Sequence, residues 1–203
     1  MALTDTQICN DALTLCGARN ILSLEDNSRE AKICKKNYAR SRDLVLRQHN
    51  WNCAIKRVIL APVTGGTPAF DYEYSFSLPA DCLKVVRVGQ DPDWRKYEWR
   101  VEGRTILFCE STLYLRYVHR IEDESLFDEN LAETIAHYLA YRISYALTGS
   151  NTVRQTVFAG YKDSLRMSKS MDAKEDSVDI LHADLFVDSR RGYNLGRTRK
   201  DQV

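Results

Sequence analysis

The sequence has almost no excess of charge of either sign and no long apolar run. Its 203 residues include 29 Lys and Arg against 28 Asp and Glu, which gives a net charge of +1. A near-neutral net charge excludes binding of nucleic acid through a positive potential over the whole molecule, although local basic patches can still exist. No apolar stretch approaches the roughly 18–20 residues that cross a bilayer, and the first residues lack the pattern of a signal peptide. With 44% apolar residues, the composition is typical of a soluble globular protein.

The short motifs of common enzymes and metal sites are also missing. The glycines at 65–66 precede Thr67-Pro68 rather than Lys and a hydroxyl residue, so this segment predicts a turn and not a phosphate-binding loop. There is no Gly-x-Ser-x-Gly sequence, no Cys-x-x-Cys pair and no zinc-like spacing of histidines. We therefore assign no catalytic residue, no metal ligand and no cofactor site. The cysteines are expected to be free thiols, since nothing indicates secretion. They are Cys9, Cys16, Cys34, Cys53, Cys82 and Cys109.

Helical periodicity occurs toward both ends of the chain. Residues 4–7 form a capping-box pattern, and a helix is expected over residues 8–16. A second helix is expected over residues 28–48, and the two are expected to form an antiparallel hairpin. Residues 128–149 and 150–174 carry apolar residues at helical spacing and predict two further helices.

The middle third alternates apolar and polar residues with a period of two, which is typical of strands. We expect a meander of about five antiparallel strands here, with Glu102-Gly103-Arg104 as one hairpin turn. Trp51 is expected to be buried where the helices meet this sheet. The predicted fold is α+β, with a helical body of about four helices (1–52 and 122–176), an inserted antiparallel β-sheet domain (53–121) and an extended C-terminal arm (177–203).

Charged residues are unevenly distributed along the chain. Residues 29–57 contain nine bases and two acids, whereas residues 121–134 contain six acids and no base. Three roles fit this pattern: solvated helix faces, a head-to-tail contact in which the basic face of one copy meets the acidic face of the next, or contact of the basic helix with DNA. The candidate subunit-interface charges are Lys32, Lys35, Lys36, Arg40, Glu122, Asp123, Glu124, Asp128 and Glu129.

Six segments, taken together and in order, resemble one protein family. They are ICNDALTLCGA (8–18), ILSLEDNSREA (21–31), RDLVLRQHNWNCA (42–54), YSFSLPADCLKV (74–85), VEGRTIL (101–107) and LTGS (147–150). The family patterns that they resemble include I-x-N-x-A-L-x-x-L-G, R-D-x-L-L-R-x-H-P-W-N-F-A and Y-x-Y-x-L-P-x-D-C-L-R-V, with Asn50 standing where Pro is common. The family is the tail tubular protein A, or head-to-tail adaptor, group of tailed bacteriophages and related prophages. The resemblance covers about residues 7–172.

The resemblance implies a non-enzymatic virion protein, made in the host cytoplasm and located at the head-to-tail interface of the tail. Such adaptors form a homo-oligomeric ring, usually of twelve copies, beneath the portal protein. The ring continues the DNA channel without sequence-specific binding and offers a platform to the tail nozzle or a downstream tail protein; no cofactor, metal or membrane is implied. Two alternatives belong to other classes: a virion-associated cell-wall hydrolase with paired carboxylates in a cleft, and a basic DNA-binding module built on residues 29–57.

The C-terminal arm has scattered apolar residues and no periodic stripe, so it gains little by folding alone. Residues 189–200 hold five bases and no acid. Guanidinium groups pair with carboxylates through two hydrogen bonds, which suits acidic clefts on a partner. The resemblance implies that the portal or a neighbouring adaptor supplies such clefts, and contact with DNA phosphates is the alternative. The predicted arm contacts are Leu185, Phe186, Val187, Arg190, Arg191, Tyr193, Arg197 and Arg199.

Overall fold

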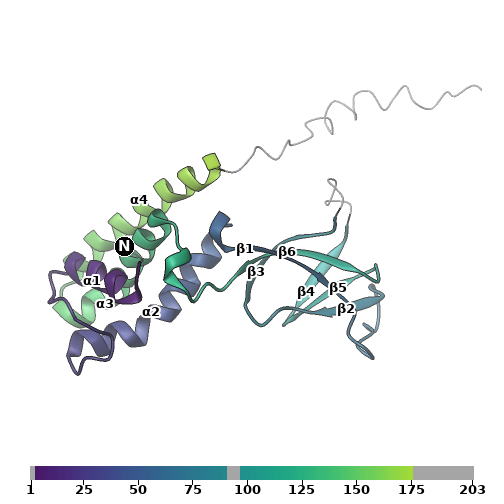
Figure 1. Ribbon diagram of the computed structural model, residues 1–203, viewed down its shortest axis with the longest axis horizontal. Helices are drawn as coiled ribbons and strands as arrows, with labels where there is room; N and C mark the ends of the chain where they lie inside the picture. Colours follow the sequence, from purple (N-terminus) through teal and green to yellow (C-terminus); the bar gives the residue numbers. More distant parts are fainter. Residues whose placement is uncertain (1–2, 91–96, 176–203) are drawn as a thin grey trace, which may run out of the picture.

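The structure is a computed structural model that describes residues 3–90 and 97–175. Helices lie at both ends of this part of the chain and strands lie between them, so the protein is α+β, as predicted (Figure 1). The predicted arm lies outside the described residues. The elements are α1 (Asp5–Leu15), α2 (Arg29–Gln48), η1 (Asn52–Ala54), β1 (Ile55–Leu60), β2 (Tyr74–Ser77), β3 (Cys82–Val88), β4 (Trp99–Glu102), β5 (Thr105–Phe108), β6 (Leu113–His119), η3 (Glu124–Leu126), α3 (Glu129–Thr148) and α4 (Asn151–Glu175).

Local capping signals set the helix boundaries. The capping box is present at α1, because Thr4 Oγ1 accepts from Gln7 N at 3.2 Å and Gln7 Oε1 accepts from Thr4 N at 3.0 Å. Ser28 caps α2 by accepting from the backbone N–H three residues later. Gly149 ends α3 in the left-handed conformation, with φ of 66°. The four helices therefore begin and end close to the residues that the sequence predicts.

The central helix of the helical body is α3. It packs against α1, α2 and α4, whereas α1 and α2 contact each other far less than each contacts α3. The expected hairpin of the first two helices is therefore not the unit that organises the body. The reason is that α3 is apolar on more than one side: Leu139 and Ile143 are fully buried on one stripe, and Ala136 and Ala140 are buried on another.

The strands form two three-stranded antiparallel sheets, in the orders β1-β6-β3 and β2-β5-β4, rather than a sequential meander. The first and last strands pair from Ile55 opposite Val118 to Leu60 opposite Leu113, which closes the insertion next to the helical body. The segment at Pro79 connects β2 of one sheet to β3 of the other. It forms a turn in which Cys82 N donates to Pro79 O. Strand pairing between the ends of the insertion thus replaces the expected order.

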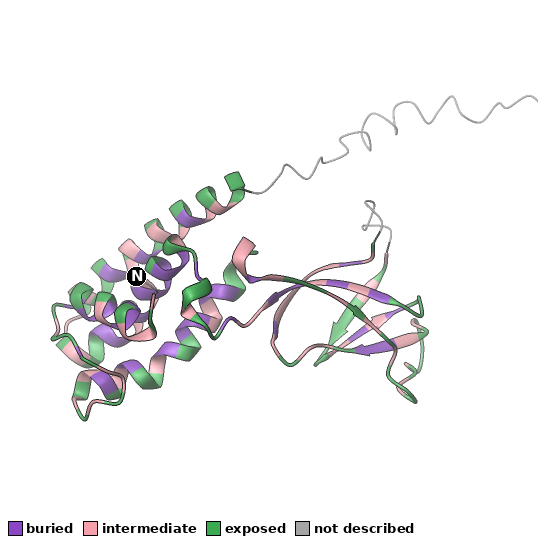
Figure 2. Ribbon diagram, viewed as in Figure 1, coloured by how far each residue is buried: buried purple, intermediate pink, exposed green. Residues whose placement is uncertain are grey.

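Two hydrophobic clusters form the interior (Figure 2). One fills the helical body and extends to Val118 at the end of β6; the other lies between the two sheets and includes Phe76, Phe108 and Leu115. Trp51 is 1% exposed and belongs to the helical cluster, where its Nε1 donates to Val45 O at 3.1 Å. The expected burial of this tryptophan at the end of α2 is confirmed.

Candidate functional site

The four predicted basic interface residues lie on the exposed surface of α2. Lys32, Lys36 and Arg40 recur every four residues, so they share one side of the helix, called here the basic face of α2. Lys35 lies beside it and forms an ion pair with Glu25, with 2.6 Å between Nζ and Oε2. The structure therefore gathers these cations on one exposed surface.

The five predicted acidic residues lie around η3 and the start of α3. Asp123 and Asp128 each cap a helix by accepting from a backbone N–H two residues later, at 3.0 and 3.2 Å. Hydrogen bonds from Ser125 hold the pKa of Asp123 below its usual value. Glu122 and Glu129 are exposed, and Glu124 is half-buried. Within the described ranges, none of these acids forms an ion pair with the basic face of α2.

The basic stretch 29–57 does not form one continuous surface. Arg42 is 7% exposed and lies in the interior. Lys56 is on β1, where its Nζ lies 3.0 Å from Asp81 Oδ2. The basic residues of this stretch are therefore divided between a helix and a strand, and a DNA-binding module built on them stays a prediction.

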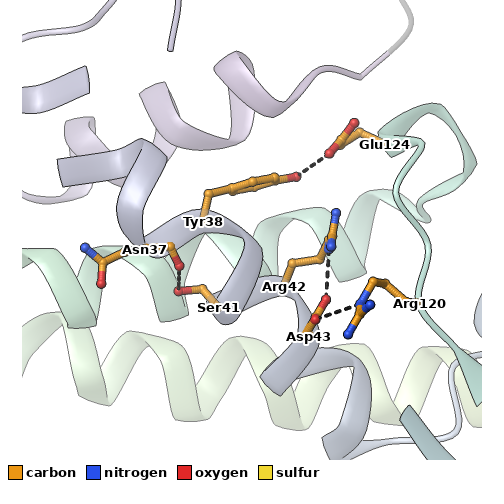
Figure 3. A network of polar contacts seen from close by, with 7 residues as sticks. All are labelled: Asn37, Tyr38, Ser41, Arg42, Asp43, Arg120 and Glu124. Carbon is orange, nitrogen blue, oxygen red and sulfur yellow. Dashed lines mark hydrogen bonds and ion pairs between the residues drawn. The ribbon is translucent and has the colours of Figure 1, made fainter. Parts of the chain in front are cut away.

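A polar network, shown in Figure 3, joins the helical body to the β1-β6-β3 sheet, called here the first sheet. Asp43 on α2 accepts from Arg42 Nε at 3.1 Å and from Arg120 Nε, just beyond β6, at 2.9 Å. Tyr38 Oη donates to Glu124 Oε1 at 3.0 Å, and burial together with this carboxylate raises the pKa of the Tyr38 hydroxyl. Glu124 is thus half-buried and hydrogen-bonded within its own chain, and its role as a subunit-interface charge stays a prediction.

A second polar contact holds the C-terminal part of α4 against the junction of α2 and β1. Asp172 Oδ2 lies 2.9 Å from His49 Nε2, and Asp172 Oδ1 accepts from Asn52 N at 3.0 Å. The side-chain Nδ2 of Asn52 also donates to the backbone carbonyl O of Asp172 at 3.0 Å. The His49 ring lies edge-on to Trp51, with 5.0 Å between centroids. This part of α4 is therefore fixed by several contacts to one residue, Asp172.

A row of three arginines crosses the first sheet. Arg57 on β1 lies opposite Arg116 on β6, and Arg116 lies opposite Arg87 on β3. The register of β3 shifts between Val85 and Arg87, and this bulge brings Arg87 rather than Val86 opposite Arg116. Side chains alternate along a strand, so the row lies on the face of the sheet turned away from the sheet core.

The arginine row lines a hollow of about 480 Å³. Tyr114 and Ile59 line the same hollow. They lie opposite each other on β6 and β1, two residues along the strands from Arg116 and Arg57, and Ile59 is 64% exposed. Arg116 Nε is buried without a hydrogen-bond partner in the described part of the chain. Sequence analysis missed this site. The alternation in β1 and β6 places each arginine on a polar face, but only the pairing of distant strands places them side by side.

Among residues 3–90 and 97–175, no group of three or more His, Cys, Asp or Glu side chains is arranged to hold a metal ion. All six cysteines are free thiols, as expected. Burial raises the pKa of Cys16 to about 11, and contact with Cys34 together with burial raises that of Cys9. The thiols of Cys9 and Cys16 therefore lack the thiolate character of a nucleophile.

Comparison with known protein families and with curated proteins finds no match to this chain. None of the helices that the structure describes is long and apolar enough to cross a membrane. The eight predicted arm contacts, from Leu185 to Arg199, lie outside the described ranges.

Proposed function

We propose that the chain is a virion head-to-tail adaptor. It would be one subunit of a ring that joins the portal protein to the tail nozzle or a downstream tail protein and continues the DNA channel. The observation that carries the proposal is that the separate segments resembling this family contact one another and form the caps, turns and joints of the fold.

Contacts between distant segments illustrate this. Asn10 in the first segment clamps the second, because its Nδ2 donates to Ile21 O at 2.9 Å and its Oδ1 accepts from Ile21 N at 2.8 Å. Arg104 in the segment 101–107 donates to Pro79 O in the segment 74–85. Such contacts favour a resemblance of one whole fold over a chance series of short motifs.

The distribution of charge gives further support. The basic face of α2 and the exposed acids Glu122 and Glu129 lie on one chain without pairing to each other. Surfaces of opposite sign on the same subunit suit a heterologous contact, in which rotation from copy to copy closes a ring. Each copy would then satisfy the charges of the next.

Native mass spectrometry of the purified chain, alone and with the portal protein of the same virus, tests the proposal. We expect a monomer or weak oligomer alone and a closed ring on the portal. A dimer with two-fold symmetry under both conditions would contradict it, because a two-fold contact pairs the same patch on both copies and so closes at two subunits instead of a ring.

Charge-reversed variants test the subunit contact itself. We expect Lys36→Glu with Arg40→Glu to prevent ring closure, and the addition of Glu122→Lys with Glu129→Lys to restore it. Lys174→Glu on α4 reverses an exposed charge elsewhere and serves as the control. If the quadruple variant fails to close while the control closes normally, these faces do not meet in the ring.

Deletion of residues 177–203 tests the predicted arm. We expect a folded chain that no longer binds the portal, because the arm carries guanidinium groups suited to acidic clefts. Equal portal binding by the truncated and full-length chains would show that the arm has no part in this contact.

A further inference from the structure

We propose that the arginine row on the first sheet is a binding site for backbone phosphates of a nucleic-acid strand. The site is formed by Arg57 and Arg116, with Tyr114 and Ile59 beside them in the same hollow. The proposal is independent of the adaptor function, because a single chain carries the complete site.

The geometry is costly unless an anion occupies it. Like charges placed directly opposite each other on neighbouring strands destabilise a sheet. Here Arg57 and Arg116 are such a pair, and the bulge in β3 adds Arg87 to the row. Within the described residues, no carboxylate lies at ion-pair distance from Arg57 or Arg116, and Arg116 Nε is buried without a hydrogen-bond partner. Because Arg87 has an interaction of its own within the chain, we rest the proposal on the other two.

The surroundings of the arginines favour a nucleic acid over other anions. Guanidinium groups bind phosphate oxygens through two parallel hydrogen bonds, and two neighbouring arginines can bind successive phosphates. Tyr114 and Ile59 supply an aromatic and an aliphatic surface next to the charges, which suits contact with a sugar or a base. An acidic peptide would use the arginines but has no general need of such a platform.

The test measures fluorescence anisotropy of a labelled 12-nucleotide thymidine strand, and of a 12-base-pair duplex, with the full-length chain at 50–200 mM NaCl. We expect Arg57→Gln with Arg116→Gln to weaken binding at least tenfold. Loss of two phosphate contacts should also reduce the slope of log affinity against log salt by about 1.5. The two arms identify the source of the phosphates, because Tyr114→Ala should weaken binding of the flexible single strand and leave duplex binding unchanged.

The matched control removes two exposed arginines elsewhere, Arg19→Gln with Arg100→Gln, and changes net charge equally. We expect it to alter affinity less than twofold. Thermal melting checks the fold, and the Arg57 and Arg116 variant should melt no lower than the unmodified chain because a like-charge contact is removed. Equal weakening by the control, unchanged binding by the site variant, or displacement of the strand by polyglutamate at equal charge concentration would overturn the proposal.

Discussion

The helical body and the sheet domain differ in the size of their hydrophobic cores. In the described part of the chain, the helical cluster contains 25 buried apolar residues and the sheet cluster contains eight. Each helix of the body packs directly against α3, or is α3 itself, whereas the sheet cluster depends on two small sheets facing each other. Buried apolar area is the main source of stability, so the helical body should be the more stable region.

The two regions also differ in how they treat polar groups. In the helical body, side chains such as Thr4, Ser28 and Asp128 satisfy free backbone N–H groups at helix ends. In the sheet domain, arginines of like charge lie side by side across the first sheet. Polar groups of the body thus satisfy the helix ends, whereas on the first sheet Arg57 and Arg116 lie opposite each other and Arg116 Nε has no hydrogen-bond partner in the described part of the chain.

Substitutions that shorten a side chain in either core should have the largest effects on stability. They should also show whether the two regions unfold separately. Leu139→Ala on α3 and Phe108→Ala on β5 each remove a buried side chain, 0% and 2% exposed. We expect losses of about 2–5 kcal/mol, from lost burial and the cavity left behind. Circular dichroism at 222 nm should show helix melting earlier in Leu139→Ala, whereas Phe108→Ala should open the sheets while the helices melt close to the unmodified chain. If both variants shift one common transition equally, the regions unfold as one unit.

The joint between the regions should be the next most sensitive position. Asp43→Ala leaves Arg42 and Arg120 without their shared carboxylate, and the Arg42 side chain is 9% exposed. We expect a loss of about 2 kcal/mol by chemical denaturation, because a nearly buried guanidinium loses its charge partner.

Asp163→Ala is the control for this prediction. Asp163 pairs with Arg166 at 3.3 Å, and both side chains are well exposed. Its removal should change stability by less than about 0.5 kcal/mol. Similar effects of the two substitutions would mean that the Asp43 network does not strengthen the joint.

The sequence predicted the helical body more completely than the sheet domain, for a physical reason. Caps at Thr4 and Ser28 and the stop at Gly149 depend on residues within one helical turn, so they can be recognised locally. The sequence pattern predicted about five strands where the structure has six, and their order depends on contacts between opposite ends of the insertion. The pairing of β1 with β6, and the bulge that aligns Arg87, have no local signal.

The candidate site follows the same rule. The basic face of α2 could be predicted, because Lys32, Lys36 and Arg40 recur at the helical period. The engagement of Glu124 by Tyr38 could not, because it joins residues from α2 and η3 that meet only when the helices pack. The arginine row escaped prediction since its members come from three strands.

A smaller effect on stability is expected from Asp81, whose carboxylate makes the stability of the sheet domain depend on pH. Partial burial opposes ionisation of Asp81, but hydrogen bonds from Lys56 and Tyr117 prevail and hold its pKa below the usual value. Its contribution to stability is therefore present above the unfolded pKa near 4 and is lost as pH falls through the lower folded pKa. Because the carboxylate is 34% exposed, Asp81→Asn should cost less than about 1 kcal/mol at pH 6. The difference from the unmodified chain should vanish at the acid end of a denaturation series; a difference that persists there would contradict the assignment.

The smallest perturbation uses the natural cysteines to compare the regions without substitution. Cys109 is exposed, Cys82 lies at the edge of the sheet core with 9% exposure, and Cys9 and Cys34 are fully buried in the helical core. The thiolate is the nucleophile that attacks a thiol reagent, and burial raises the pKa of Cys82, so a buried cysteine reacts only when its region opens. At pH 8 we expect Cys109 to react first, Cys82 later, and Cys9 with Cys34 last, with each site assigned by peptide mass spectrometry. Six thiols should be counted after denaturation without reductant. Labelling of Cys82 and Cys34 at the same rate would mean that the two regions open together, and the difference in core size would then have no counterpart in stability.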